Sequence, residues 1–168
     1  MDGLCSLYAA IHSLRLALAD YEPIGRSRCL ELFEVGVGFL GRKMELEEAI
    51  VLGVGIRRRT ALVRHLARAV STSNCQLEVH HPNYESWSSI ADVFGWIEGS
   101  IAQGMPVLVT LTGGLDHHTV VAGATPTTLQ LFDSGGHRFL RKASCGLREG
   151  YHRIPPKGLL RIAVHRRD

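Results

Sequence analysis

A histidine and a carboxylate lie sixteen residues apart in the second half of this 168-residue chain, and together they could form a general base with its orienting partner. His117 stands at the start of one apolar stretch, and Asp133 stands at the end of the next, just before a Gly-Gly pair. Two such stretches predict a β-hairpin, whose outer ends lie side by side. We therefore expect His117 and Asp133 to share a hydrogen bond that fixes the imidazole tautomer.

The candidate nucleophile is Cys5, far upstream of the hairpin. A helical pattern begins directly after the turn pair Asp2-Gly3, so the thiol lies in the first helical turn. The positive end of the helix dipole favours a thiolate there, and backbone N–H groups can hold a developing oxyanion. Alone, Cys5 could equally be a small buried core residue, but the His/Asp pair favours a nucleophile. The cysteines at positions 29, 75 and 145 lack this helix-start position and are predicted to be structural.

Other interpretations of the same residues stay open at this point. Successive strand residues point to opposite faces, so only one of His117 and His118 can face Asp133, and periodicity does not decide which. Asp133 could merely cap its turn. Asp116 and the two histidines could suggest a metal, but no further ligand falls at a recognisable spacing, so no metal or cofactor is expected. His12 lies on the same helix as the cysteine, too far along the axis to act as its base.

The elements that must position these residues form a helical front part followed by a β-rich part. Spacings of three and four predict a helix over 4–20 and further helices over about 26–40 and 45–52. Another helix opened by Thr60 should run to Val70, and one more should cover 86–103. Strands are expected over 76–80, 107–111 and 159–164, besides the hairpin at 117–133. This order predicts a single α+β domain, with a mainly helical lobe over 1–104 and a mainly β lobe over 105–168.

Composition and charge narrow the class of protein. The apolar fraction of 45% and charged fraction of 21% are typical of an ordinary soluble globular domain. The net charge of +3 comes partly from Arg57-Arg58-Arg59, which we interpret as a solvated face because no nucleic-acid motif accompanies it. No apolar run is long enough to span a bilayer, and the start lacks the basic region of a signal peptide. With no CxxC pair, these features predict a reduced, cytoplasmic protein with neither nucleic acid nor membrane as partner.

The hairpin spacing resembles that of papain-like cysteine peptidases. In that family an Asn-His pair is followed by a glycine six residues after the histidine and by Asn-Ser-x-Gly sixteen after it. Here His117, Gly123 and the run that starts at Asp133 fall at the same offsets. The run from Cys5 is similar to the family's nucleophile helix, Cys-Gly-x-x-Ala, with Ser6 in place of the usual small residue. The aspartate at the third position of the triad and the small size of the chain look most like the bacterial double-glycine peptidases that process bacteriocin leaders.

The resemblance implies specific roles. Cys5 would be the nucleophile, His117 rather than His118 the base, and Asp133 the orienter, acting on a peptide or protein without a cofactor. The family's oxyanion-donating Gln, six residues before the cysteine, would precede Met1; either an N-terminal piece is absent or another donor serves. Losing one such donor costs roughly 100- to 1,000-fold in rate.

Three functions therefore follow as hypotheses: hydrolysis of an amide, acyl transfer through the same triad, or a catalytically weak binding module with an unreactive Cys5. The arginines at 57–59 would flank the cleft and favour an acidic substrate. Neither the cleavage-site preference nor the oligomeric state is predicted.

Overall fold

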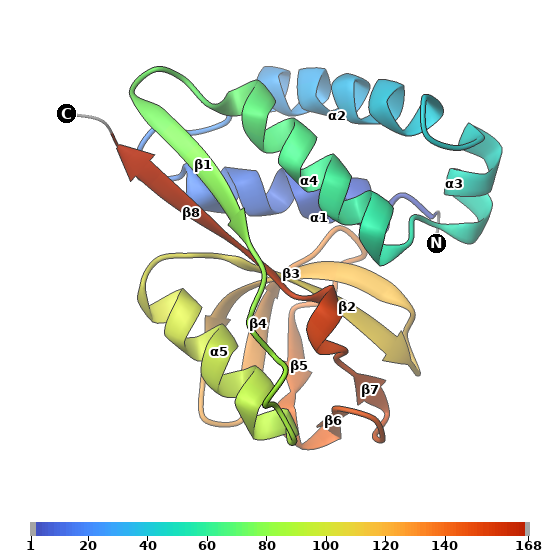
Figure 1. Cartoon of the computed structure of the whole chain (residues 1–168), viewed down its shortest axis with the longest axis vertical. Coiled ribbons are helices and arrows are strands. Elements are labelled where there is room, and N and C mark those ends of the chain that lie inside the picture. The colour runs from blue at the N-terminus through green and yellow to red at the C-terminus, as the bar shows by residue number, and fades with distance from the viewer. Residues whose placement is uncertain (1–2, 167–168) are drawn as a thin grey trace.

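The computed structural model describes residues 3–166 and has α+β architecture (Figure 1). Within these residues the helices are α1 (Cys5–Ala17), α2 (Arg26–Gly41), α3 (Leu46–Leu52), α4 (Ile56–Val70) and α5 (Ile90–Ala102). The longer strands are β1 (Cys75–His80), β2 (Val107–Gly113), β3 (His117–Ala124), β4 (Thr128–Phe132) and β8 (Leu160–Arg166). The shorter ones are β5 (Phe139–Arg141), β6 (Cys145–Gly146) and β7 (His152–Arg153), and 3-10 turns occupy Lys142–Ser144 and Pro156–Gly158.

The strands form one antiparallel path in the order β1-β8-β2-β3-β4-β5. The short β7 joins the end of β2, and β6 pairs with β7 in parallel. The β3–β4 hairpin carries an irregularity between Val121 and Gly123, where the register shifts. In Figure 1 the long β1–β8 ribbon runs diagonally upward across the helices, while the remaining strands curl beneath them.

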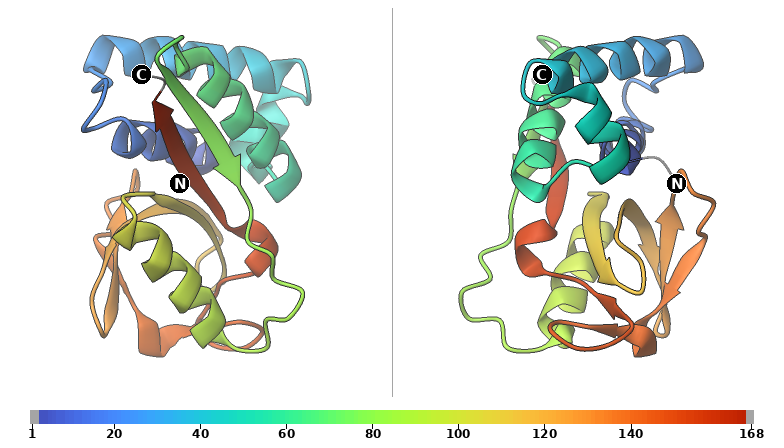
Figure 2. Two further views of the ribbon diagram at one scale, coloured as in Figure 1. Left: turned by 60° about the vertical axis from the view of Figure 1, so that its left-hand side comes forward. Right: turned by 90° about the vertical axis from the view of Figure 1, so that its right-hand side faces the viewer.

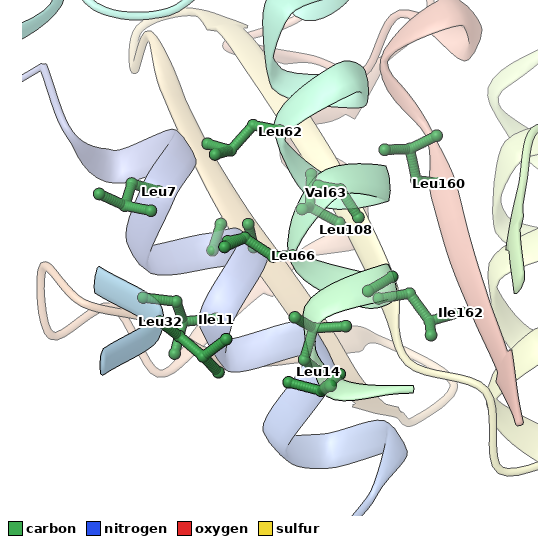
Figure 3. Close-up of a cluster of buried hydrophobic side chains, with 14 of the residues drawn as sticks. Leu7, Ile11, Leu14, Leu32, Leu62, Val63, Leu66, Leu108, Leu160 and Ile162 are labelled. Carbon is green, nitrogen blue, oxygen red and sulfur yellow. The ribbon is translucent and has the colours of Figure 1, made fainter. Parts of the chain in front are cut away.

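The side chains bury two separate hydrophobic clusters. The first lies between α1, α2 and α4 on one side and the strands β2 and β8 on the other (Figure 3). Its fully buried leucines include Leu7, Leu62, Leu108 and Leu160. Burying a leucine side chain contributes roughly 1.5–3 kcal/mol, so this cluster firmly anchors the helix that carries Cys5.

The second cluster packs α5 against the opposite face of strands β2 and β3. Val93 and Ile97 of α5 pack with Val109, Val121 and Leu129 of the strands. Figure 2 shows α5 within the strand-rich half, apart from the other helices. Although α5 precedes residue 104, it therefore shares its core with the β-rich half of the chain.

Most predicted elements are confirmed, and the differences have local causes. The helix expected to open at Thr60 begins at Ile56, so the arginine run forms its first turn. The helix expected over 86–103 begins only at Ile90, because Ser89 and Asp92 form a capping box. The strands β5, β6 and β7 were not predicted because they are very short.

The interpretation of Arg57-Arg58-Arg59 as a solvated face is wrong for one member. Arg57 and Arg58 are exposed, but Arg59 is completely buried. Position 59 precedes Leu62 and Val63 by three and four residues, which places it on the core-facing side of α4. In the part of the chain that is described, none of the helices combines the length and apolar character needed to cross a bilayer.

Candidate active site

A cavity of about 540 Å³ opens where the start of α1 meets the β2–β3 pair and the segment that joins α3 to α4. Such a volume can accept a few residues of a peptide or one small ligand. The sequence-predicted residues Cys5 and His117 both line it, together with Asp116 and His118. The remaining lining residues are Gly3, Val51, Leu52, Gly53, Val54, Gly55, Ile56, Thr110, Leu111 and Thr112.

Cys5 is the first residue of α1, and its side chain is half-buried at the cavity wall. The chain just before it is held against α3, because the Gly3 N–H donates to the Ile50 carbonyl at 2.6 Å. A Cβ on Gly3 would lie 2.3 Å from the Ala49 carbonyl oxygen, so only glycine fits this approach. Gly53, with φ of 81°, forms the facing backbone. These contacts hold the thiol at the positive end of the helix dipole.

The predicted bond between His117 and Asp133 is confirmed. Nε2 of His117 lies 2.6 Å from Oδ1 of Asp133, and the two side chains are 1% and 0% exposed. The other carboxylate oxygen, Oδ2, accepts N–H bonds from Gly135 at 2.8 Å and His137 at 3.2 Å. The carboxylate therefore orients the histidine with one oxygen and caps its own turn with the other, so the two interpretations left open by the sequence are both right.

The protonation of the pair follows from these contacts. Burial alone would raise the pKa of Asp133, but the nearby Thr119 hydroxyl, the His117 imidazole and the His137 N–H outweigh burial and lower it. The Thr119 hydroxyl itself lies outside hydrogen-bonding geometry. An ionised carboxylate can only accept, so Nε2 of His117 carries the proton.

The other ring nitrogen of His117 is left as a potential base. Nδ1 is buried and has no hydrogen-bond partner among the described residues. Because Nε2 holds the proton, Nδ1 of the neutral imidazole carries a lone pair. A buried acceptor without a partner is unusual, and active sites are among the places where one occurs. His137 stacks edge-on against the His117 ring with centroids 5.7 Å apart, which further restrains the imidazole.

His118 is held in a different way, although it lines the same cavity. Its Nε2 lies 3.1 Å from the Val54 carbonyl, and its Nδ1 lies 3.1 Å from both Arg59 Nη1 and the Thr110 hydroxyl. Burial, with the neighbouring positive charge of Arg59, lowers the pKa of His118 to about 3. Both nitrogens are therefore engaged and the ring stays neutral at physiological pH, so His118 joins β3 to the 53–55 segment instead of transferring protons.

Arg59 is a cation that the sequence did not place in this region. Its guanidinium donates to the Thr110 hydroxyl and, at 2.9 Å, to the Gly158 carbonyl, and no carboxylate among residues 3–166 forms an ion pair with it. Burial lowers the pKa of Arg59 to about 9, and the charge of a Cys5 thiolate acts in the opposite direction. Since this attraction is mutual, the guanidinium favours the thiolate form of Cys5.

The other chemistry-capable residues lie away from the cavity. None of the four cysteines, all within the described residues, forms a disulfide, and burial raises the pKa of Cys75 and Cys145. His12 packs against the Phe132 ring at 4.5 Å, and burial lowers its pKa. Neither His12 nor the cysteines at positions 29, 75 and 145 line the cavity.

One group of side chains could hold a metal ion. Glu78, His80 and His165 gather on the outer β1–β8 pair, where both imidazole Nε2 atoms lie 3.2–3.3 Å from one carboxylate oxygen. Two histidines and a carboxylate form a donor set that zinc can use. None of the three lines the cavity that contains Cys5, so this group plays no part in the chemistry of the thiol.

Comparison with known proteins finds no family model, no curated protein and no solved structure that matches the chain. The function is therefore inferred from the residues, distances and burial at the cavity.

Proposed function

We propose that the protein is a papain-like cysteine hydrolase that cleaves an amide bond in a peptide or protein substrate. One observation carries the proposal. The protonated Nε2 of His117 donates to Asp133, and Nδ1 of the same ring has no hydrogen-bond partner among the described residues. His117 and Cys5 line the same cavity. A nucleophile, a base and an orienting carboxylate in this relation are the requirements of covalent acyl chemistry.

In the proposed mechanism, Nδ1 of His117 accepts the proton of the Cys5 thiol. The thiolate attacks the substrate carbonyl carbon, and the C–N bond breaks as the imidazolium returns its proton to the leaving amine. Water then attacks the thioester carbonyl carbon while His117 accepts a proton from it. The C–S bond breaks, the imidazolium returns this proton to the Cys5 sulfur, and the acid product leaves. Asp133 stabilises the imidazolium that forms in both halves of the reaction.

Developing negative charge has three sources of stabilisation in this arrangement. The N-terminus of α1 carries Cys5, and that of α4 reaches the same cavity at Ile56. Both present the positive end of a helix dipole. The buried Arg59 guanidinium adds a full positive charge behind the wall. Such preorganised groups contribute most to catalysis when they face the site of charge development.

The rim of the cavity indicates an apolar substrate side chain near the scissile bond. Val51 and Leu52 line the cavity and are 69% and 78% exposed. Exposed neighbouring apolar groups of this kind commonly mark a binding surface. We accordingly propose a peptide with an apolar residue beside the scissile amide, cleaved in the reducing cytoplasm.

Thiol-directed labelling tests the proposal. The full chain is treated with a leucine-containing peptidyl vinyl sulfone, and the adduct is located by mass spectrometry. Cys5 should label, Cys5→Ala and His117→Ala should abolish labelling, and Cys29→Ala, the matched half-buried cysteine, should not. Equal labelling of the Cys5→Ala and Cys29→Ala variants would refute the assignment. With a cleaved peptide in hand, a product whose mass includes an added amine would assign acyl transfer instead of hydrolysis.

A further inference from the structure

A second groove opens directly beside the thiol cavity. It has a volume of about 1070 Å³ and lies between the first half of α4, the loop after β1 and the 3-10 turn Pro156–Gly158. Gly55 and Ile56 line both the groove and the cavity, so the two adjoin at these residues. In Figure 1 the start of α4 lies above the red segment that contains this turn. A chain bound at Cys5 can therefore pass over Ile56 into the groove.

Cations line the groove, and three of the four have no carboxylate partner among the described residues. Arg57, Arg58, Arg64 and Lys157 contribute four positive charges, and the remaining lining residues include no Asp or Glu. Arg58 has a loose ion pair with Glu48 at 3.8 Å. Within residues 3–166, no carboxylate forms an ion pair with the other three. The groove consequently presents an unneutralised positive field.

Three of the four cations belong to α4, and Lys157 belongs to the turn Pro156–Gly158. Arg57 and Arg64 are both exposed and stand seven residues apart on α4, which places them two turns apart along the helix, with the buried Thr60 between them. Burial and the positive charge of Arg64 lower the pKa of His81 across the groove, so this imidazole is neutral and adds no charge at physiological pH. Four cations along one groove suit several carboxylates in succession.

We propose that this groove binds an acidic segment of the peptide whose scissile amide lies at Cys5, an inference that rests on the proposed hydrolase function. Extended peptide advances about 3.3 Å per residue, so a run of three or four acidic residues can span two turns of α4. The occupant is a peptide because the groove adjoins the thiol cavity, where the scissile amide of a peptide would lie. A single-stranded nucleic acid would need several aromatic stacking surfaces, and the rings that line the groove are those of Tyr84 and His81 alone.

Peptide binding to the full-length Cys5→Ala protein tests the groove. The probe is a fluorescein-labelled peptide with an apolar residue followed by four glutamates, measured by fluorescence anisotropy, with a four-glutamine peptide for comparison. Exposed ion pairs contribute modestly, so two charge reversals should weaken binding about tenfold or more. Arg57→Glu with Arg64→Glu should show this loss. Arg68→Glu, an exposed arginine on the same helix outside the groove, should not.

Three results would overturn the inference. The first is equal affinity for the glutamate and glutamine peptides, and the second is equal weakening by Arg68→Glu and by the groove variant. The third is a single-stranded oligonucleotide that displaces the peptide and binds more tightly. Circular dichroism of each variant establishes that it is folded.

Labelling of Cys5 separates this inference from the proposed function. The vinyl sulfone probe contains no acidic residue, so it reports on the thiol alone. A reactive Cys5 in a protein that does not distinguish the two peptides overturns the groove and leaves the hydrolase. A groove that selects the glutamate peptide beside an unreactive Cys5 overturns the hydrolase and assigns an acidic-peptide binding site.

Discussion

Replacing Asp133 with asparagine separates the two tasks of its carboxylate. Oδ1 accepts from Nε2 of His117, and Oδ2 accepts from the N–H groups of Gly135 and His137. An asparagine side chain has one oxygen and one NH₂ group, so it can satisfy only one of these sides.

The magnitudes decide how the amide of Asp133→Asn will be oriented. If its oxygen faces His117, the NH₂ group opposes the N–H groups of Gly135 and His137. Each unsatisfied group costs about 1–3 kcal/mol, so the total is roughly 2–6 kcal/mol. If the oxygen faces the turn, the NH₂ group donates to Nε2 of His117, and the imidazole only moves its proton to Nδ1. The second orientation keeps every hydrogen bond and should prevail.

That orientation removes the base. With the proton on Nδ1, His117 has no lone pair for the Cys5 thiol, and no carboxylate charge stabilises an imidazolium. The same change in a Ser-His-Asp triad lowers turnover on the order of 10⁴-fold. We expect the rate of Cys5 labelling by the vinyl sulfone at pH 7 to fall about 10³- to 10⁴-fold, while circular dichroism and the melting temperature change little.

The assay combines kinetics with a direct view of the tautomer. Intact-mass spectrometry gives the second-order labelling rate, and long-range ¹H–¹⁵N spectra report which nitrogen of His117 holds the proton. Asp20→Asn changes an exposed carboxylate in the turn that follows α1, so it is the matched control and should leave the rate unchanged. A folded Asp133→Asn protein that labels within about tenfold of the parent would refute the argument.

The remaining predictions concern the residues around the site. Because the pKa of His118 falls from 6.5 to about 3 on folding, the unfolded chain binds an extra proton between these values. The free energy of unfolding should therefore decrease as pH falls through this window, by up to about 1.4 kcal/mol per unit. His118→Gln should flatten this slope in urea titrations and His65→Gln should not; an unchanged slope in His118→Gln contradicts the reasoning. Arg59→Met should slow labelling roughly tenfold at pH 6 and less at pH 9, because the thiolate loses its counter-charge; parallel pH profiles would exclude that role. Gly3→Ala should lower the free energy of unfolding by about 1–3 kcal/mol, since its Cβ would meet an α3 carbonyl, whereas Gly25→Ala meets nothing within 4 Å; equal melting temperatures would count against this account.

Much of the site was predictable because its parts depend on local geometry. A two-strand pattern with a short connection brings its outer ends together, so a contact between Asp133 and one of the two adjacent histidines, His117 or His118, followed from spacing. Helix periodicity likewise placed Cys5 in the first turn of α1. The choice of His117 over His118 came from resemblance in spacing, and the bonds of the two rings agree with it.

The residues that sequence reasoning missed have partners far along the chain. Arg59 contacts Gly158, 99 positions away, and nothing in a run of three arginines singles out the one that becomes buried. His118 contacts Val54, 64 positions away. One sequence signal for the burial of Arg59 was available. Arg59 precedes the buried Leu62 by three residues and the buried Val63 by four, so it lies on the same face of α4. If the helix had been predicted to begin at Ile56 instead of Thr60, this helical spacing would have predicted that Arg59 is buried.

The sequence by itself determined the α+β class, the helix that begins at Cys5 and the hairpin that joins His117 to Asp133, because periodicity and short connections act locally. Only the tertiary structure decided three features: Nδ1 of His117 has no hydrogen-bond partner among the described residues, both nitrogens of the neutral His118 ring are hydrogen-bonded, and Arg59 is buried against Thr110 and His118 of the cavity wall. Each of these depends on which distant segments pack together and how completely they exclude water. Such information lies in three-dimensional contacts that residue spacing does not contain.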